Sequence, residues 1–391
     1  MNQTGKGQRI LMLTSHHDAQ DGRIYHLEAK TLQKAGFSVA IVAPGHTPLS
    51  WENNGVRFYT FTKKPSGFQR KWSTLSALID YAEKIPADFL HVHEVDAPLM
   101  AAAWVKFRCR RKRSQPKIIF DSHEVWQYFY AAKVRNPWLR ASIKHGVVAY
   151  EEWMISRFVD GIITAHELEE HYYRLLNPWI PVRKVLGAPP LDLWGKPPER
   201  SGPIRVIGHD GYFSLRRGMA TILAAFETVA FDYSNVSLLA AGDFHFPEDR
   251  EYFQRWENRT GLTNRVVCTG WVDRSEIQHH LDKMDIGLIA NKPDIHSIRC
   301  FPANKLMYYL GRALPVISTP APLYKRFIEA ERCGLVMTDF SPQSLERRLR
   351  WMIEHPTPTR EMGWRGYQIA QREFHPNQAK EQLLLLYKSL C

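Results

Sequence analysis

The residues best suited to chemistry lie in residues 301–319, which the sequence predicts to be a loop, a helix, a tight turn and a buried strand. Helical spacing begins near Lys305 and puts Leu306, Tyr309 and Leu310 on one face. A helix that follows a strand and a loop directs its first N–H groups, and a partial positive charge, at the space above the sheet. Lys305 adds a full charge there. In an open α/β sheet this arrangement predicts a site for an anionic ligand, most simply a nucleotide diphosphate.

A second group of cations, Arg216 and Arg217, precedes Gly218 in the loop after another predicted strand. When a nucleotide leaves, negative charge develops on its phosphate, so a cation at that point stabilises the transition state. Arg217 and Lys305 together are predicted to form such a clamp. The alternative for both arginines is an ordinary solvated surface.

Two candidates follow predicted strands in the first half of the chain. His123 comes just after the strand at residues 117–120, where α/β sheets place ligands, so it is the leading candidate for the reacting centre. The alternative is a structural histidine that bonds a backbone group. Glu94 is predicted to face a cleft as an acceptor-binding group or a general base. Its alternative is a solvated loop or helix N-cap.

A metal site is not predicted. His91 and His93 alternate on one strand and therefore face the same way, which is half of a metal site. No third ligand stands at a telling spacing, and no D-x-D pair is present. The sequence thus predicts chemistry without a metal or other cofactor.

The elements that position these residues form two successive α/β halves. A strand at 9–15, a helix at 25–35 and a strand at 37–43 make a βαβ unit with a parallel sheet. Its first loop lacks G-x-G-x-x-G, which argues against a dinucleotide-binding Rossmann enzyme at this end. The proline-rich residues 178–202 predict a linker, and a second βαβ series begins at residue 204.

Length and composition agree with this division. A chain of 391 residues is too long for one ordinary core, and 44% hydrophobic with 24% charged residues is typical of a soluble globular protein. No run of 18 apolar residues predicts a transmembrane helix, and the polar N-terminus lacks the apolar core of a signal peptide. Five scattered cysteines without a C-x-x-C pair suit a reducing cytoplasm.

The net charge of +12 indicates an anionic partner. Two basic segments with interleaved aromatic residues, from Lys63 to Lys71 and from Lys106 to Arg113, are predicted to meet an anionic membrane surface. A plain solvated face is the alternative. Nucleic acid is not expected as a partner, because no nucleic-acid-binding motif is present.

Residues 301–319 also resemble the P-x-K-L-F-E-Y-M-A-x-G-x-P-V-I segment of GT-B glycosyltransferases of the large family-4-like group. The matching residues are Lys305, Leu306, Tyr309, Pro315, Val316 and Ile317. The glutamate with which that family holds the nucleotide ribose aligns with Tyr308, and the acidic residue eight positions earlier aligns with Cys300. The pattern S-H-x-x-x-D-x-R-I at residues 15–24 looks like the opening of bacterial members, and the resemblance covers most of the chain.

The resemblance implies an α/β, GT-B fold with two Rossmann-like doubly wound domains facing a central cleft. Residues 1–190 would bind the acceptor, residues 191–365 would bind the nucleotide-sugar, and residues 366–391 would carry a helix that packs back on the first domain. The implied activity is a hexosyltransferase reaction (EC 2.4), retaining and free of bound metal. It would move a sugar from a nucleotide-sugar donor to a glycan or lipid-linked acceptor. Its expected setting is bacterial cell-surface polysaccharide synthesis, in the cytoplasm or peripherally on the inner face of the plasma membrane.

The resemblance also implies a role for each residue that aligns with a functional position of the family. The implied donor-binding residues are Arg217, Lys305, Tyr308, His209 and Gly208; the acceptor-side loop residues are His17, Asp21 and Arg23; and the catalytic residues are His123 and Glu94. His209 stands where the family has an arginine. That substitution, with Tyr308 and Cys300, favours the alternative of a catalytically silent GT-B scaffold. A GT-B sugar-nucleotide epimerase or hydrolase is the third hypothesis.

Overall fold

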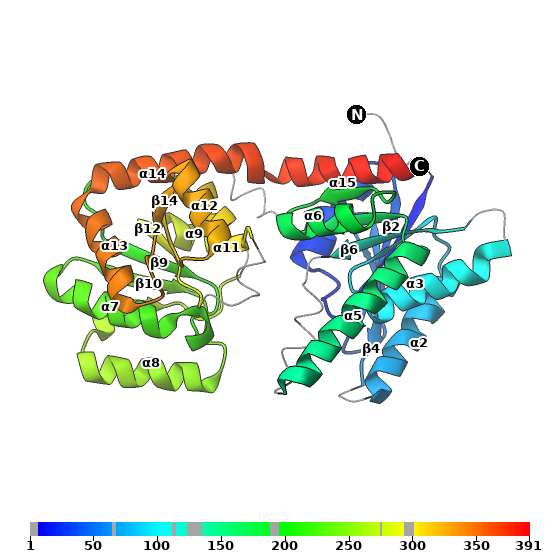
Figure 1. Ribbon diagram of the computed structural model, residues 1–391, viewed down its shortest axis with the longest axis horizontal. Helices are drawn as coiled ribbons and strands as arrows, with labels where there is room; N and C mark the ends of the chain where they lie inside the picture. The colour runs from blue at the N-terminus through cyan, green and yellow to red at the C-terminus, as the bar shows by residue number, and fades with distance from the viewer. Residues whose placement is uncertain are drawn as a thin grey trace. The chain divides into compact units, whose positions relative to one another are not determined.

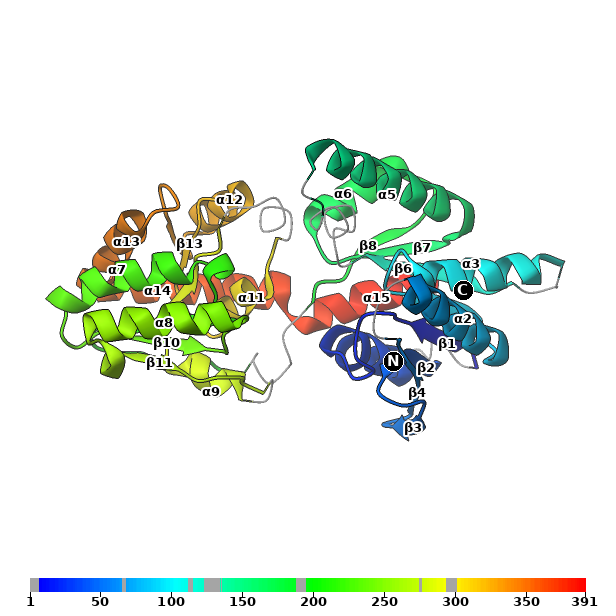
Figure 2. The same cartoon turned by 90° about the horizontal axis from the view of Figure 1, so that it is seen from below.

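The computed structural model describes residues 7–64, 68–111, 115–122, 134, 136–187, 195–273, 276–292 and 301–391. The chain divides into two compact units, Met1–Ala188 with Pro376–Cys391, and Pro189–His375. Each unit contains one predominantly parallel sheet covered by helices (Figures 1 and 2). The predicted α/β class with two parallel-sheet domains is therefore confirmed.

The sheet of the first unit has eight strands in the order β3-β4-β2-β1-β5-β6-β7-β8. They are β1 (Arg9–Leu13), β2 (Ser38–Gly45), β3 (Ser50–Asn53), β4 (Val56–Thr62), β5 (Phe89–Val92), β6 (Lys117–Ser122), β7 (Gly161–Thr164) and β8 (Val182–Lys184). Only β3 pairs antiparallel among the described strands; the other pairs are parallel. Parallel strands are covered on both faces, which explains why β1 reads as a continuous apolar run.

Helices cover both faces of this sheet (Figure 1). They are the π-helix η1 (Gly22–Ala29), α1 (Lys30–Lys34), α2 (Phe68–Lys84), α3 (Ala97–Arg108), η2 (Cys109–Arg111), α5 (Pro137–Phe158), α6 (Glu167–Leu176) and α15 (Pro376–Leu390). Side chains of α2, α3, α5 and α6 form one core cluster, and those of η1, α1 and α15 form the other. The C-terminal element of this unit starts at Pro376, ten residues later than the boundary predicted from the sequence.

The sheet of the second unit has six parallel strands in the order β11-β10-β9-β12-β13-β14. They are β9 (Val206–Asp210), β10 (Ser237–Ala241), β11 (Val266–Cys268), β12 (Ile286–Ile289), β13 (Val316–Ser318) and β14 (Gly334–Val336). The chain runs outward from β9 to β11 and then returns to β12 beside β9. The order therefore reverses between β9 and β12, and α/β sheets bind ligands at such switch points.

The helical elements of the second unit are η4 (Leu215–Arg217), α7 (Met219–Asp232), α8 (Pro247–Thr260), η5 (Thr263–Arg265), α9 (Ile277–Asp282), α11 (Asn304–Gly311), α12 (Pro322–Glu331), α13 (Pro342–Glu354), α14 (Pro356–Ile369) and η6 (Ala370–Phe374). In Figure 1, α8 lies below the strands and α14 lies above them. No helix in the described part of the chain is long and apolar enough to span a membrane.

One segment differs from the sequence-based expectation. The predicted linker at 178–202 contains β8, which pairs with β7 and so belongs to the first sheet.

Candidate functional site

The predicted anion site lies where β9 ends and α11 begins. Lys305, in the first turn of α11, is buried, and its Nζ lies 3.2 Å from Nε2 of His209 on β9. The same His209 nitrogen lies 3.2 Å from the carbonyl oxygen of Tyr212. The switch point of the sheet therefore holds a buried lysine against a buried histidine.

The charges of this cluster are strongly affected by burial. Burial lowers the pKa of Lys305 to about 7; Asp210 opposes that shift and Arg217 adds to it. Burial, followed by the charge of Lys305, lowers the pKa of His209 well below its ordinary value. Burial also raises the pKa of Asp210. An anion beside Lys305 would favour its charged form and reverse the effect of burial.

Arg217 and Lys305 approach the same glycine. A Cβ atom on Gly211 would lie 3.3 Å from Nη1 of Arg217 and 3.8 Å from Cε of Lys305. Gly211 has φ +76°, in the left-handed region that favours glycine. The Arg217 guanidinium also lies 5.7 Å from the ring centre of Tyr212, within cation–π range. The two cations predicted to act together are thus brought to one loop.

The two neighbouring tyrosines of α11 differ in environment. Tyr309 is fully buried, accepts a 2.9 Å hydrogen bond from the N–H of Asp210 and donates to the carbonyl of Leu288 at 3.3 Å. Tyr308 is half-buried. Helical spacing alone places Tyr309 on the apolar face of this helix and predicts no polar role for it. The available signal was that a buried tyrosine usually needs a partner for its hydroxyl.

Gly208, another predicted donor-site residue, has a packing role inside β9. A Cβ atom there would lie 2.1 Å from the sulfur of Met284, so no larger residue fits without a shift. Contact of Gly208 with a donor stays a prediction. His123 and Cys300 lie outside the described residues.

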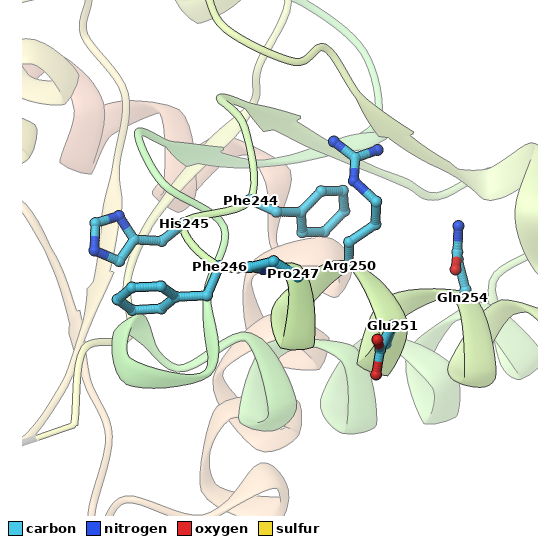
Figure 3. A pocket seen from close by; sticks show the side chains of 7 residues that line it. All are labelled: Phe244, His245, Phe246, Pro247, Arg250, Glu251 and Gln254. Atoms are coloured by element: carbon cyan, nitrogen blue, oxygen red, sulfur yellow. The ribbon is translucent and has the colours of Figure 1, made fainter.

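An open pocket of about 410 Å³ lies beside the anion site, at the start of α8. Its lining consists of Phe244, His245, Phe246, Pro247, Arg250, Glu251 and Gln254 (Figure 3). The His245 ring lies 4.5 Å from that of Tyr212, and Trp271 lies 6.3 Å from the same ring. Aromatic side chains therefore continue from Arg217 towards this pocket.

In the first unit, the Glu94 carboxylate binds the loop after β1. Its carboxylate is fully buried and accepts hydrogen bonds from the Thr14 hydroxyl at 2.6 Å and the Ser15 and His16 N–H groups at 2.9 and 3.1 Å. A general base must reach its substrate. This geometry counts against the general-base role and against exposure to a cleft, and favours a positioning role.

The three predicted acceptor-side residues do not act alike. Asp21 caps η1 by accepting from the N–H groups of Arg23 and Ile24. Burial alone would raise the pKa of Asp21, but His17, at 3.5 Å, and these N–H groups together hold it well below its usual range. Arg23 turns inward instead of facing an acceptor, because buried carboxylates bind its guanidinium.

Arg23 lies in a buried polar cluster that the sequence does not predict. Its guanidinium donates to both oxygens of Asp121, at 2.8 and 2.9 Å, and lies 3.0 Å from Glu28. His91 and His93, the suspected half of a metal site, lie against the same two carboxylates. Glu28 comes from η1, His91 from β5, His93 from the residue after β5, and Asp121 from β6, so their sequence spacing carries no metal signature.

In the second predicted membrane segment, from Lys106 to Arg113, ion pairs neutralise part of the positive charge. Lys106 pairs with Asp160 at 2.6 Å, and Arg108 pairs with Glu83 at 3.1 Å. Phe107 is nevertheless about half exposed, with the Arg110 guanidinium 4.2 Å from its ring centre.

Each of the two units matches a family model of known proteins. Residues 22–183 match the family model described as Glycosyltransferase Family 4, and residues 205–355 match Glycosyl transferases group 1. Between them the two matches span most of the chain. No curated protein matches the sequence.

Solved structures share the fold at low sequence identity. Sucrose-phosphate synthase from Thermosynechococcus elongatus is 16% identical, with a TM-score of 0.71 over 98% of this chain and 99% of that one. Anabaena HepE, solved in complex with UDP, is 14% identical, with a TM-score of 0.71 over 98% and 100%. WaaG, a glycosyltransferase involved in lipopolysaccharide biosynthesis, is 13% identical, with a TM-score of 0.66 over 95% and 98%. With its two family matches and this fold, the chain is a GT-B glycosyltransferase of the family-4-like group.

Proposed function

We propose that this glycosyltransferase takes its sugar from a nucleotide-sugar donor bound by the second unit. The observation that carries the proposal is the approach of Arg217 and Lys305 to Gly211 at the switch point of the sheet. Two cations at one backbone turn suit a diphosphate, whose negative charge grows as the nucleotide leaves. Tyr308 and His209 complete the proposed donor site, with the Tyr308 hydroxyl in place of a ribose-binding carboxylate.

The aromatic row beside this site supports the same donor class. Tyr212 lies next to Arg217, and His245 and Trp271 lie beside Tyr212, so these rings offer flat faces on which a nucleotide base can stack. HepE has been solved with UDP and with UDP-glucose, which supports a nucleotide-sugar here by analogy. The transferred group is proposed to be a hexose, in a retaining reaction that needs no bound metal.

The acceptor is proposed to be a glycan or lipid-linked precursor of a cell-surface polysaccharide, bound by the first unit near His17, Asp21 and His123. The role of WaaG in lipopolysaccharide biosynthesis supports this class. With such an acceptor, the protein would act at the cytoplasmic face of the plasma membrane. The exposed side chains of Trp72, Trp104 and Phe107 on α2 and α3 are the proposed contact with an anionic surface.

Calorimetric titration with UDP, GDP and dTDP tests the donor site. Micromolar binding of one nucleotide, lost in both Lys305→Ala and Arg217→Ala, is the expected result. Transfer that collapses in His123→Ala would then separate an enzyme from a silent scaffold. The scaffold alternative is favoured by His209 and Tyr308, and binding of none of the three nucleotides would support it. A sugar-nucleotide epimerase would instead turn over its donor without any acceptor.

A further inference from the structure

The buried cluster in the first unit has the composition of a metal site. Four potential ligand atoms, one each from Glu28, His91, His93 and Asp121, all lie within 4.8 Å of one another. All four side chains are fully buried. We propose that these residues bind one divalent cation, Zn²⁺, in a closed structural site that takes no part in the transfer reaction.

The ligand types favour zinc. Two imidazoles and two carboxylates form a borderline set that suits Zn²⁺ in tetrahedral coordination, whereas calcium and magnesium prefer oxygen ligands alone. Metal–ligand distances near 2.1 Å put tetrahedral ligand atoms about 3.4 Å apart. Ligand atoms 4.8 Å apart must therefore close by about 1.4 Å, which rotation of the long Glu28 side chain can supply.

The surroundings prepare the histidines as ligands. Nδ1 of His91 lies 3.0 Å from the hydroxyl of Tyr387 on α15, so Nε2 faces Glu28, whose Oε2 lies 3.8 Å away. Nδ1 of His93 lies 3.3 Å from Asp121, another of the proposed ligands. The two imidazole rings stack with centres 4.7 Å apart. For His91, Tyr387 is a partner from outside the ligand set that fixes one ring nitrogen, and such a partner is usual for metal-binding histidines.

Glu28 is the ligand with the greatest need for a cation. Neither of its oxygens accepts a hydrogen bond from the described residues, and its Oε1 is 3.0 Å from Arg23. The π-helical turn of η1 spaces Arg23 and Glu28 five residues apart on one face, and π-helical segments frequently mark functional sites.

The test is the metal content of the full-length protein, purified without chelators and measured by inductively coupled plasma mass spectrometry. About one zinc per chain is expected, lost in His93→Gln and kept in the control His279→Gln, an exposed histidine of α9. Tyr387→Phe keeps the ring but removes the hydroxyl beside His91, and should weaken Zn²⁺ binding about 10- to 100-fold.

A measurement on the unaltered protein guards against variants that fail to fold. Co²⁺ added to chelator-treated protein should give the visible absorption of tetrahedral cobalt, and Zn²⁺ should abolish it and raise the melting temperature. Absence of both zinc and the cobalt spectrum overturns the proposal. In that case a proton on Glu28, which forms a hydrogen bond to Asp121, would balance the charge of the cluster. Zinc retained in His93→Gln would overturn it equally.

Discussion

Nζ of Lys305 lies 3.2 Å from Nε2 of His209, with both side chains buried at the switch point of the second sheet. Two groups that can each carry a positive charge are thus held together away from water. Burial, partly opposed by Asp210, keeps the pKa of Lys305 near 7, and its charge helps to keep His209 neutral. The site is therefore poised to accept an anion and a proton together.

Removal of Lys305 should weaken nucleotide binding strongly. A hydrogen bond to a charged group contributes about 1.5–3 kcal/mol, so Lys305→Ala should raise the Kd for the bound nucleotide diphosphate about 10- to 150-fold. Lys325→Ala removes an exposed lysine of α12 in the same unit and should leave Kd unchanged. Calorimetric titration measures both. Equal affinities in the two variants would exclude Lys305 from the donor site.

Nucleotide binding should also depend on pH through Lys305. The free protein holds the pKa of this lysine at about 7, and a bound diphosphate raises it. Below that pH the lysine is already charged before binding. Above it, each binding event takes up a proton, so Kd should rise by up to about tenfold per pH unit. Titrations in buffers of different ionisation enthalpy count that proton.

Lys305→Arg provides the control, because arginine stays charged throughout this range. Its Kd should lack the rise above neutrality. A wild-type Kd that does not change between about pH 7 and pH 8.5 would contradict the proton-linked site.

The adjacent tyrosines of α11 should separate stability from binding. Tyr309→Phe leaves the buried N–H of Asp210 without its 2.9 Å partner, so it should lower the free energy of unfolding by about 1–3 kcal/mol. Tyr308→Phe should cost less stability than Tyr309→Phe, because Tyr308 is only half-buried, but it should weaken donor binding if its hydroxyl replaces the ribose-binding carboxylate. Denaturation and titration of both variants measure the two effects. Loss of stability in Tyr308→Phe alone would reverse the assignment.

Much of the fold could be predicted because parallel strands are covered on both faces. Ile10–Leu13 and Ile286–Ile289 are short apolar runs that identify buried strands from composition alone. β8 escaped this signal, since it contributes only three residues within a proline-rich segment. Pairing with β7, which depends on the whole sheet, makes it a strand.

The site residues also differ in how well the sequence alone could place them. The proximity of Lys305 and Arg217 could be anticipated because each residue follows its own strand at the same edge of one sheet. Arg23 could not be placed, because whether it faces a ligand or the interior depends on Glu28 and Asp121, and the second of these lies 98 residues away. The metal hypothesis for His91 and His93 needed the same two carboxylates.

Arg23 should be essential for the stability of the first unit. In the metal-free protein, Arg23→Met leaves Glu28 and Asp121 buried without a cation, and breaking a buried ion pair in this way costs about 3–5 kcal/mol. Arg9→Met breaks the exposed pair with Asp88 and should cost at most about 1 kcal/mol. Chemical denaturation compares the two. Similar losses in both variants would mean that water reaches the cluster.

Glu151 should make the first unit less stable as pH rises towards neutrality. Burial, opposed by the hydroxyl of Tyr173, raises the pKa of Glu151 to about 7, above its ordinary 4.5. Between these values the unfolded chain loses this proton while the folded protein keeps it. The contribution of Glu151 to stability therefore falls by up to about 1.4 kcal/mol per pH unit and levels off above pH 7. Glu151→Gln lacks this titration, so its stability relative to wild type should increase from pH 5 to pH 7 in denaturant unfolding. A constant difference across that range would mean that Glu151 is already ionised in the folded protein.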